Sequence, residues 1–247
     1  MRFTVQPLDG GEPVVLHDSR LAHRVGAWLA RDGVEGWFGT PAVREGVASR
    51  SMTDGDMAPL TLTQGARTVT LHGIVDASST VECARMLDLV DGLAGRELAI
   101  VGEDAHGARE MRGFMSDDPD PTLRPDEAVA LFDLTMTCPD PHKYGPEVAY
   151  RATGGLALVS NPGNCDSWPR VVVEGGVTGL VISLGGRTVS WTGDQQGLEI
   201  DLATGGASGG TIGVDNAFAI PPGDHAVSVS CTPSGCAVAV LVRPCWR

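Results

Sequence analysis

The sequence predicts an all-β protein with one helix, and three observations support this class. Glycine and proline together make up about a fifth of the 247 residues without a collagen-like period, which indicates many turns between short elements. Runs of alternating or β-branched apolar residues recur along the chain, whereas helical periodicity is clear in one segment only. The composition, 42% hydrophobic and 20% charged, is typical of a folded globular protein. The length allows one large β domain or two smaller ones.

The first part of the chain reads mainly as strands. The clearest are residues 67–75 (RTVTLHGIV) and 128–137 (AVALFDLTMT), which alternate apolar with polar or small side chains. The acidic, proline-containing run 116–121 (SDDPDP) reads as a solvated loop. These features predict a β-sandwich or barrel-like domain at the N-terminal end.

One helix interrupts these strands and is expected at about 80–94. Ser79 and Glu82 have the spacing of a capping box, and Gly92 or Gly95 provides a stop signal. An apolar stripe at helical spacing predicts the face that covers the sheet, and it consists of Cys83, Met86, Leu87, Val90 and Ala94.

A domain boundary is predicted between residues 142 and 143. The segment 138–146 (CPDPHKYGP) holds three prolines, which are incompatible with helix and with central ladder pairing. Formal charge also changes here, from −11 over residues 1–142 to −2 over residues 143–247. We therefore expect an N-terminal β domain, 1–142, and a C-terminal domain, 143–247.

The second domain is predicted to be a β-sandwich. Short apolar runs alternate with glycine-rich turns at the spacing that sandwiches show, as in RVVVE followed by two glycines. The expected strands are 170–174, 179–184, 187–191, 197–202, 211–214, 225–231 and 236–243.

Charge and hydropathy exclude several classes of function. The net charge of −13 disfavours non-specific binding to nucleic acid and to an anionic membrane surface, because both require a basic face. No run of eighteen apolar residues and no leader pattern is visible, so we expect a protein made in the cytoplasm, without membrane insertion. A reducing compartment predicts free thiols for all six cysteines, Cys83, Cys138, Cys165, Cys231, Cys236 and Cys245, although Cys231 and Cys236 could face each other across a hairpin.

Motifs for catalysis and ligation are weak or incomplete. Residues 206–210 (GASGG) match the form of a nucleophile elbow around Ser208, but the glycines and the following TIGV cannot form the helix that this motif needs. The DGD at 54–56 lacks the remaining ligands of a calcium loop, and the single lysine, Lys143, has no phosphate-binding loop around it. We therefore expect no enzyme, no catalytic residue, no cofactor and no metal site.

Tryptophans of the second domain offer an alternative interpretation. The rings of Trp168, Trp191 and Trp246 could form a platform on which sugar rings stack, as in a carbohydrate-binding module in which Trp168 or Trp191 contacts a host surface glycan. Packing in the core or at an interface is the other interpretation of these rings, and both remain open at this point.

Four pieces of the sequence, in order, carry a family resemblance. Residues 36–44 (GWFGTPAVR), with Arg50 and the TDGD at 53–56, come first, and 67–73 (RTVTLHG) follow before the helix. TCPDPHKYG at 137–145 and NPGNCDSWP at 161–169 complete the set. Their pattern resembles distal tail proteins, minor tail proteins at the tail tip or baseplate of long-tailed, siphovirus-type bacteriophages of actinobacteria.

The resemblance implies a structural virion protein. Members of this family are similar in having an N-terminal β domain that forms a hexameric ring and a C-terminal galectin-like β-sandwich. The ring would join the tail tube protein to the tail-tip hub protein and let DNA pass, first in the host cytoplasm during assembly and then at the virion tail tip. For the ring interface we expect the apolar segment Trp37, Phe38 and Gly39.

Overall fold

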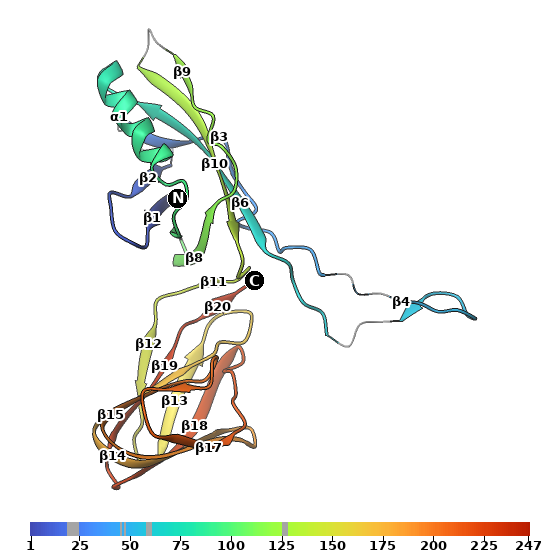
Figure 1. Ribbon diagram of the computed structural model, residues 1–247, viewed down its shortest axis with the longest axis vertical. Helices are drawn as coiled ribbons and strands as arrows, with labels where there is room; N and C mark the ends of the chain where they lie inside the picture. Colours follow the sequence, from blue (N-terminus) through green and yellow to red (C-terminus); the bar gives the residue numbers. More distant parts are fainter. Residues whose placement is uncertain (19–24, 45, 47, 58–60, 125–127) are drawn as a thin grey trace. The chain divides into compact units, whose positions relative to one another are not determined.

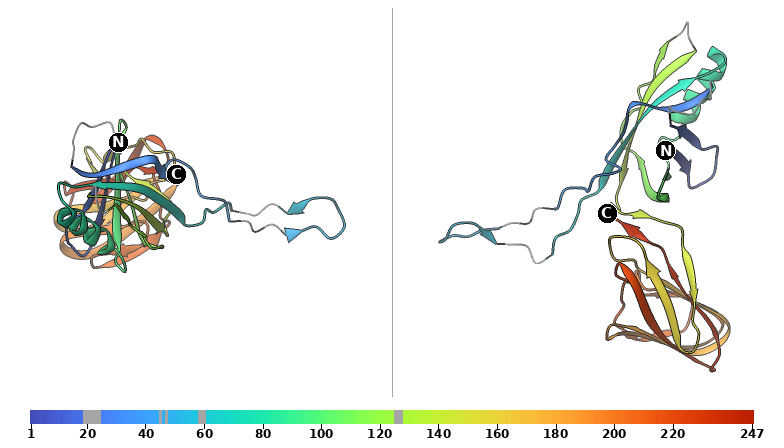
Figure 2. Two further views of the ribbon diagram at one scale, coloured as in Figure 1. Left: turned by 90° about the horizontal axis from the view of Figure 1, so that it is seen from above. Right: turned by 180° about the vertical axis from the view of Figure 1, so that it is seen from behind.

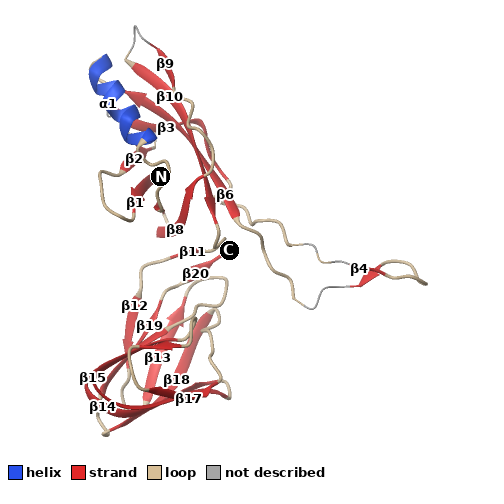
Figure 3. Cartoon of the chain, in the orientation of Figure 1, coloured by secondary structure: helices blue, strands red, loops and turns tan. Residues whose placement is uncertain are grey.

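A computed structural model describes residues 1–18, 25–44, 46, 48–57, 61–124 and 128–247 (Figure 1). The chain forms two compact units, Met1–Lys143 and Tyr144–Arg247. Strands dominate both units, and the described residues contain a single helix (Figure 3). That helix is too short to cross a membrane.

The first unit is a closed, barrel-like sheet. Its strands pair in the order β8-β7-β1-β2-β3-β6-β10-β9, and β8 also pairs with β10 through Met115 and Met136, which closes the sheet on itself. The interior is apolar and includes Phe3, Leu71 and Leu134, each fully buried. The bounds are β1 (Arg2–Pro7), β2 (Val14–His17), β3 (Gly26–Glu35), β4 (Ala48–Ser49), β5 (Asp56–Met57), β6 (Arg67–Asp76), α1 (Thr80–Asp91), β7 (Leu98–Asp104), β8 (Gly107–Met115), β9 (Thr122–Arg124) and β10 (Val129–Cys138).

Helix α1 covers strands β6 and β10 of this sheet. Ser79 caps its N-terminus by accepting a hydrogen bond from the backbone of Glu82, and the Glu82 carboxylate reaches back to the backbone of Ser78. Cys83, Leu87 and Val90 are the buried face, as the stripe predicts. The helix ends at Asp91 and Gly92 caps it, so Ala94 lies beyond the helix and is exposed.

The second unit is a sheet of eight strands folded around its own core. The first half of β14 pairs with β19, and its second half pairs with β18, so this long strand belongs to both halves of the fold. Trp191, Phe218 and Val240 lie in the core between them. The bounds are β12 (Val148–Arg151), β13 (Leu156–Asn161), β14 (Arg170–Leu184), β15 (Arg187–Asp201), β16 (Gly206–Ala207), β17 (Thr211–Asp215), β18 (Gly223–Thr232), β19 (Ala237–Val242) and β20 (Cys245–Trp246); β11 (Lys143–Tyr144) begins at the last residue of the first unit.

Two pairs of expected strands are continuous in the structure. The segments 170–174 and 179–184 join as β14, and 187–191 and 197–202 join as β15. The pairing register shifts between Val173 and Gly176, and Gly175 has a positive φ of 84°. The glycines therefore form a bulge that bends a strand rather than a turn that ends it.

The expectation of six free thiols is wrong for two of them. Cys165 and Cys245 form a disulfide, with 5.5 Å between their Cα atoms. They are 80 residues apart in sequence, and only the fold brings them together. Cys83, Cys138, Cys231 and Cys236 are free.

Candidate functional site

A long arm leaves the first unit between strands β3 and β6 (Figures 1 and 2). We call residues 40–66 the arm. Near its base the two limbs are joined by backbone hydrogen bonds, from Arg44 to Thr63 at 2.7 Å and from Gly65 to Ala42 at 3.2 Å. Farther out, β4 pairs with β5. The described arm residues lie outside both core clusters, so backbone pairing is their main support.

Large apolar side chains of the arm are exposed. Met52 is 93% exposed, Leu62 70% and Met57 57%, and Phe38 at the base of the arm is 65% exposed. Single exposed apolar residues are ordinary on a protein surface, but here several lie along one projecting hairpin. The arm is therefore a candidate interaction surface.

Two buried cations anchor the base of the arm. The Arg67 guanidinium, at the start of β6, donates to the carbonyl oxygen of Gly36 at 2.8 Å and also to those of Trp37 and Gly39. Its Nε donates to Pro141 O at 2.8 Å. The guanidinium thus joins the segment before the arm to the segment that ends the first unit.

The second cation is Lys143, the only lysine of the chain. Its Nζ donates to Trp37 O at 2.7 Å and lies 5.7 Å from the centre of the Trp37 ring. Burial, followed by the charges of Arg67 and Arg109, lowers the pKa of Lys143 to about 8, although Asp104 opposes this shift. Burial is also the main cause that lowers the pKa of Arg67.

Trp37 completes the anchor from inside the first unit. Its side chain is only 2% exposed and meets Phe3 edge to face, with 5.1 Å between the ring centres. The ring fits because Gly102 lies beside it, where a Cβ would come within 2.5 Å of the indole. Trp37 was expected at a ring interface, but its side chain packs in the core and leaves no surface for a neighbouring chain. Phe38 is exposed, and Gly39 contributes its carbonyl oxygen to Arg67.

The two tryptophans of the second unit lie in opposite environments. Trp191 is 1% exposed, and its Nε1 donates to Gly209 O at 2.6 Å, so the core interpretation holds for this ring. Trp168 is 48% exposed. A glycan contact through Trp191 is therefore wrong, and of the two rings only Trp168 is accessible.

The weak catalytic motifs occupy surface loops and edges. Ser208 follows the short strand β16, and its hydroxyl accepts a hydrogen bond from the backbone of Glu199 at 3.0 Å. Thus no helix follows Ser208, as the glycines indicate. Asp54 and Asp56 are exposed at the end of the arm.

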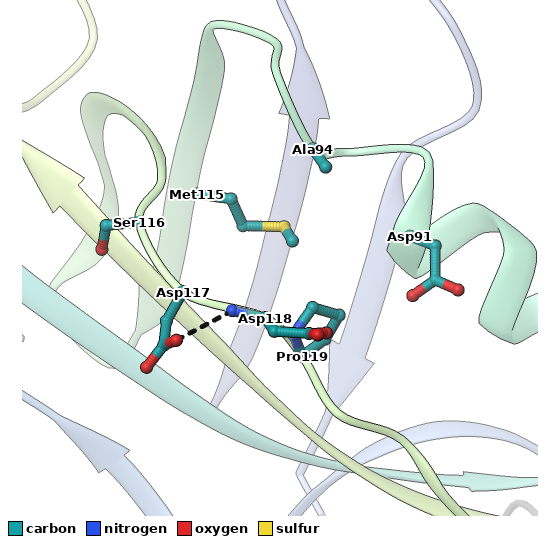
Figure 4. Close-up of a pocket in the computed structure, with 7 residues that line it drawn as sticks. All are labelled: Asp91, Ala94, Met115, Ser116, Asp117, Asp118 and Pro119. Atoms are coloured by element: carbon teal, nitrogen blue, oxygen red, sulfur yellow. Dashed lines mark hydrogen bonds between the residues drawn. The ribbon is translucent and has the colours of Figure 1, made fainter.

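A hollow of about 520 Å³ lies near the C-terminal end of α1 (Figure 4). Asp91, Asp117 and Asp118 line it together with Met115 and Pro119. Asp117 accepts a hydrogen bond from the backbone of Asp118 at 3.0 Å, which is the local bonding of a turn. Asp117 and Asp118 belong to the segment 116–121 that was expected as a solvated loop, whereas Asp91 is the last residue of α1. The hollow shows no arrangement specific for a ligand.

Sequence reasoning missed the arm and its anchor. Met52 and Met57 are isolated from other large apolar residues, and Leu62 belongs only to the short run Leu60-Thr61-Leu62, so no sustained periodicity marks them. Lys143 had one visible signal, since a single lysine beside three prolines is unusual. Its contact with a carbonyl 106 residues away required the fold.

Comparisons with known proteins were made on sequence and on structure. No family model and no curated protein matches the sequence. By structure the chain is similar to the Dit protein of phage SPP1, which is described as a paradigm of the hub adsorption apparatus in phages that infect Gram-positive bacteria; the TM-score is 0.70, with 14% identity over 99% of both chains.

A weaker similarity links the chain to a component of the phage P2 baseplate in its activated conformation. For the baseplate structure with Ca, the TM-score is 0.50 and the sequence identity 8%, and the match covers 99% of this chain and 98% of the baseplate chain. With Sr the TM-score is again 0.50, with 9% identity over 98% of both. At these identities the likeness is one of fold, and for SPP1 Dit it extends over both units.

Proposed function

We propose that this chain is a distal tail protein, a structural component at the tail tip of a long-tailed, siphovirus-type phage. The observation that carries the proposal is the fold likeness to SPP1 Dit, which covers 99% of each chain and includes both units. A structural similarity confined to one β-sandwich would say little about function, because β-sandwiches serve many different functions. Here the order of the two units also matches, and the motifs in the sequence point to the same family in phages of actinobacteria.

In this proposal six copies form a ring, and the arm provides contacts between neighbours. The exposed side chains of Met52, Met57 and Leu62 are removed from water when the arm lies on the next subunit. Closed cyclic symmetry satisfies every arm without producing a fibre. Phe38 lies at the base of the arm, where it could join the same interface.

Charge is consistent with a ring through which DNA passes. Residues 1–142 carry a formal charge of −11, and a channel with few cationic contacts lets a polyanion move without binding. The ring would connect the tail tube protein to the tail-tip hub protein. It would assemble in the host cytoplasm and then remain in the virion, with the second, galectin-like unit on the outside.

Electron microscopy of the purified full-length chain tests this proposal. Each chain carries −13, so ring formation should be favoured at high salt, where the Debye length falls from about 10 Å at 0.1 M to about 3 Å at 1 M. Six-fold rings with a central opening are the expected result. Monomers at every salt and protein concentration, together with absence of the chain from purified tails, would contradict it.

A further inference from the structure

A cleft in the second unit lies where three loops meet. Its volume is about 310 Å³, at the lower end of the roughly 300–1,000 Å³ that small-ligand sites span. One loop precedes β14, the second is the turn between β14 and β15, and the third precedes β18. The side chains that matter for recognition are Asp166, Trp168, Leu184, Arg187, Phe218 and Pro221.

The backbone on both sides of Trp168 is fixed although its ring is half exposed. Ser167 exchanges two backbone hydrogen bonds with Ile220, of 2.9 and 2.7 Å, and its buried hydroxyl donates to Arg243 O at 2.7 Å. On the other side Pro169 is buried, and its carbonyl accepts from Leu202 at 3.2 Å. A residue before proline is also restricted to extended conformations.

Exposure of a single aromatic ring is ordinary on a protein surface, and what distinguishes Trp168 is that it lines a cleft beside hydrogen-bonding side chains. Trp168 does not extend from a mobile loop, since its neighbours belong to the bonded framework of the second unit. The backbone that carries the indole is therefore held in place before any ligand arrives. Such preorganisation lowers the entropic cost of ordering the site when a ligand binds.

Charged groups of opposite sign line the same cleft. Asp166 supplies carboxylate oxygens, which accept hydrogen bonds, and Arg187 supplies guanidinium N–H groups, which donate them. The Arg187 Nη1 donates to Ala217 O at 3.4 Å, which ties this side chain to the third loop. The two formal charges cancel, so the cleft offers both kinds of hydrogen-bonding group without a net charge.

We propose that this cleft binds a neutral saccharide of one or two rings. The C–H face of a pyranose ring stacks on the Trp168 indole, and its hydroxyl groups donate to Asp166 and accept from Arg187. The cleft binds without cleaving, because one carboxylate lines it, whereas hydrolysis of a glycosidic bond usually requires two. This inference is independent of the ring; if the ring also forms, several clefts on one particle gain avidity.

Saturation-transfer NMR on the full-length chain tests the inference. The panel consists of methyl glycosides of glucose, galactose, mannose, rhamnose, N-acetylglucosamine and N-acetylgalactosamine, the disaccharides maltose, lactose and diacetylchitobiose, and galacturonate as an anionic probe. We expect transfer to at least one neutral sugar, with the ring protons of one face affected most. Trp168→Ala should weaken binding at least tenfold, and Trp168→Phe should retain part of it.

Matched variants separate the cleft from general effects on folding. Leu158→Ala removes another exposed apolar side chain of the second unit, 72% exposed, and should leave sugar binding unchanged. Asp166→Asn keeps the shape of the cleft and removes its negative charge, and Arg187→Gln removes the guanidinium. Each should weaken binding several-fold. Asp166 and Arg187 are exposed, so these two variants should fold. They therefore test the inference even if Trp168→Ala does not fold.

Four results would overturn the inference. The first is no transfer to any neutral sugar of the panel by the wild-type chain. The second is equal binding by the wild type, Asp166→Asn and Arg187→Gln. The third is stronger binding of galacturonate than of every neutral sugar, which would assign the cleft to an anion. A change of oligomeric state in Trp168→Ala without any sugar binding also counts against it, because Trp168 would then be a protein contact.

Discussion

The arm and the cleft around Trp168 both expose large apolar side chains, but their backbones are supported differently. The arm extends from the first unit with its two limbs bonded to each other, and its described residues belong to neither core. In the cleft, each loop is bonded to another loop or to the framework of the second unit. A segment without a core gains order from a partner chain, whereas a rigid cleft suits a small ligand.

The largest effect on stability is expected at the base of the arm. Arg67→Met removes a buried guanidinium that serves four carbonyl groups, and we expect the first unit to lose about 3–5 kcal/mol of its free energy of unfolding. Urea unfolding measures the loss. The matched control is Arg187→Met, an exposed arginine with one hydrogen bond of 3.4 Å, for which about 0.5 kcal/mol or less is expected. Equal effects of the two substitutions would mean that Arg67 anchors nothing.

The first loop of the cleft begins directly after a disulfide, because Cys165 precedes Asp166. Reduction of Cys165–Cys245 opens a loop of 80 residues, which should lower the free energy of unfolding of the second unit by about 2–4 kcal/mol and leave the first unit unchanged. Urea unfolding with and without dithiothreitol measures this difference. The double variant Cys165→Ala/Cys245→Ala should not respond to the reductant. A response in that variant would place the effect elsewhere.

Lys143 gives the anchor a dependence on pH. Its pKa is lowered to about 8 in the folded chain, from 10.5, so the unfolded chain binds more protons between these values. Stability therefore rises with pH through this window, by up to about 3 kcal/mol relative to Lys143→Met. Below about pH 8 Lys143 is charged in the folded chain, so the full cost of burying that charge lowers the free energy of unfolding. Urea unfolding at pH 7, 8, 9 and 10 tests the trend, and a constant difference between wild type and variant would contradict it.

Substitutions along the arm itself should barely affect folding. Met52→Ser, Met57→Ser and Leu62→Ser each change an exposed side chain, so we expect changes in the free energy of unfolding of about 0.5 kcal/mol or less. Thermal unfolding of the isolated, dilute chain measures them. A loss of several kcal/mol from any one of them would show that the arm packs on its own unit.

The sequence predicted regular features well because they depend on local patterns. Strands β6 and β10 and helix α1 follow from alternation, an apolar stripe and a capping box. The glycines at 175–176 were misread as a turn, since bulges and turns both favour glycine. They differ in whether a neighbouring strand continues to pair on both sides of the glycine, as β15 does here. The strands β12 and β13 were not expected at all.

The candidate sites were harder to predict because long-range contacts create them. Trp37 and Phe38 are adjacent in sequence, yet one ring is in the core and the other in solvent, and no local signal separates them. The same holds for Trp168 and Trp191. Arg67 and Lys143 become an anchor only when residues 36–39 and 141 fold against them.

Sedimentation velocity tests most directly whether the arm assembles this chain. The wild type is compared at 1 M salt with the triple variant Met52→Ser/Met57→Ser/Leu62→Ser and with a control, Val148→Ser/Leu158→Ser/Val214→Ser, which changes three exposed apolar residues of the second unit. We expect six-subunit particles for the wild type and the control, and folded monomers for the arm variant. Six-subunit particles formed equally well by the arm variant, or a wild type that remains monomeric, would contradict the proposed role of the arm.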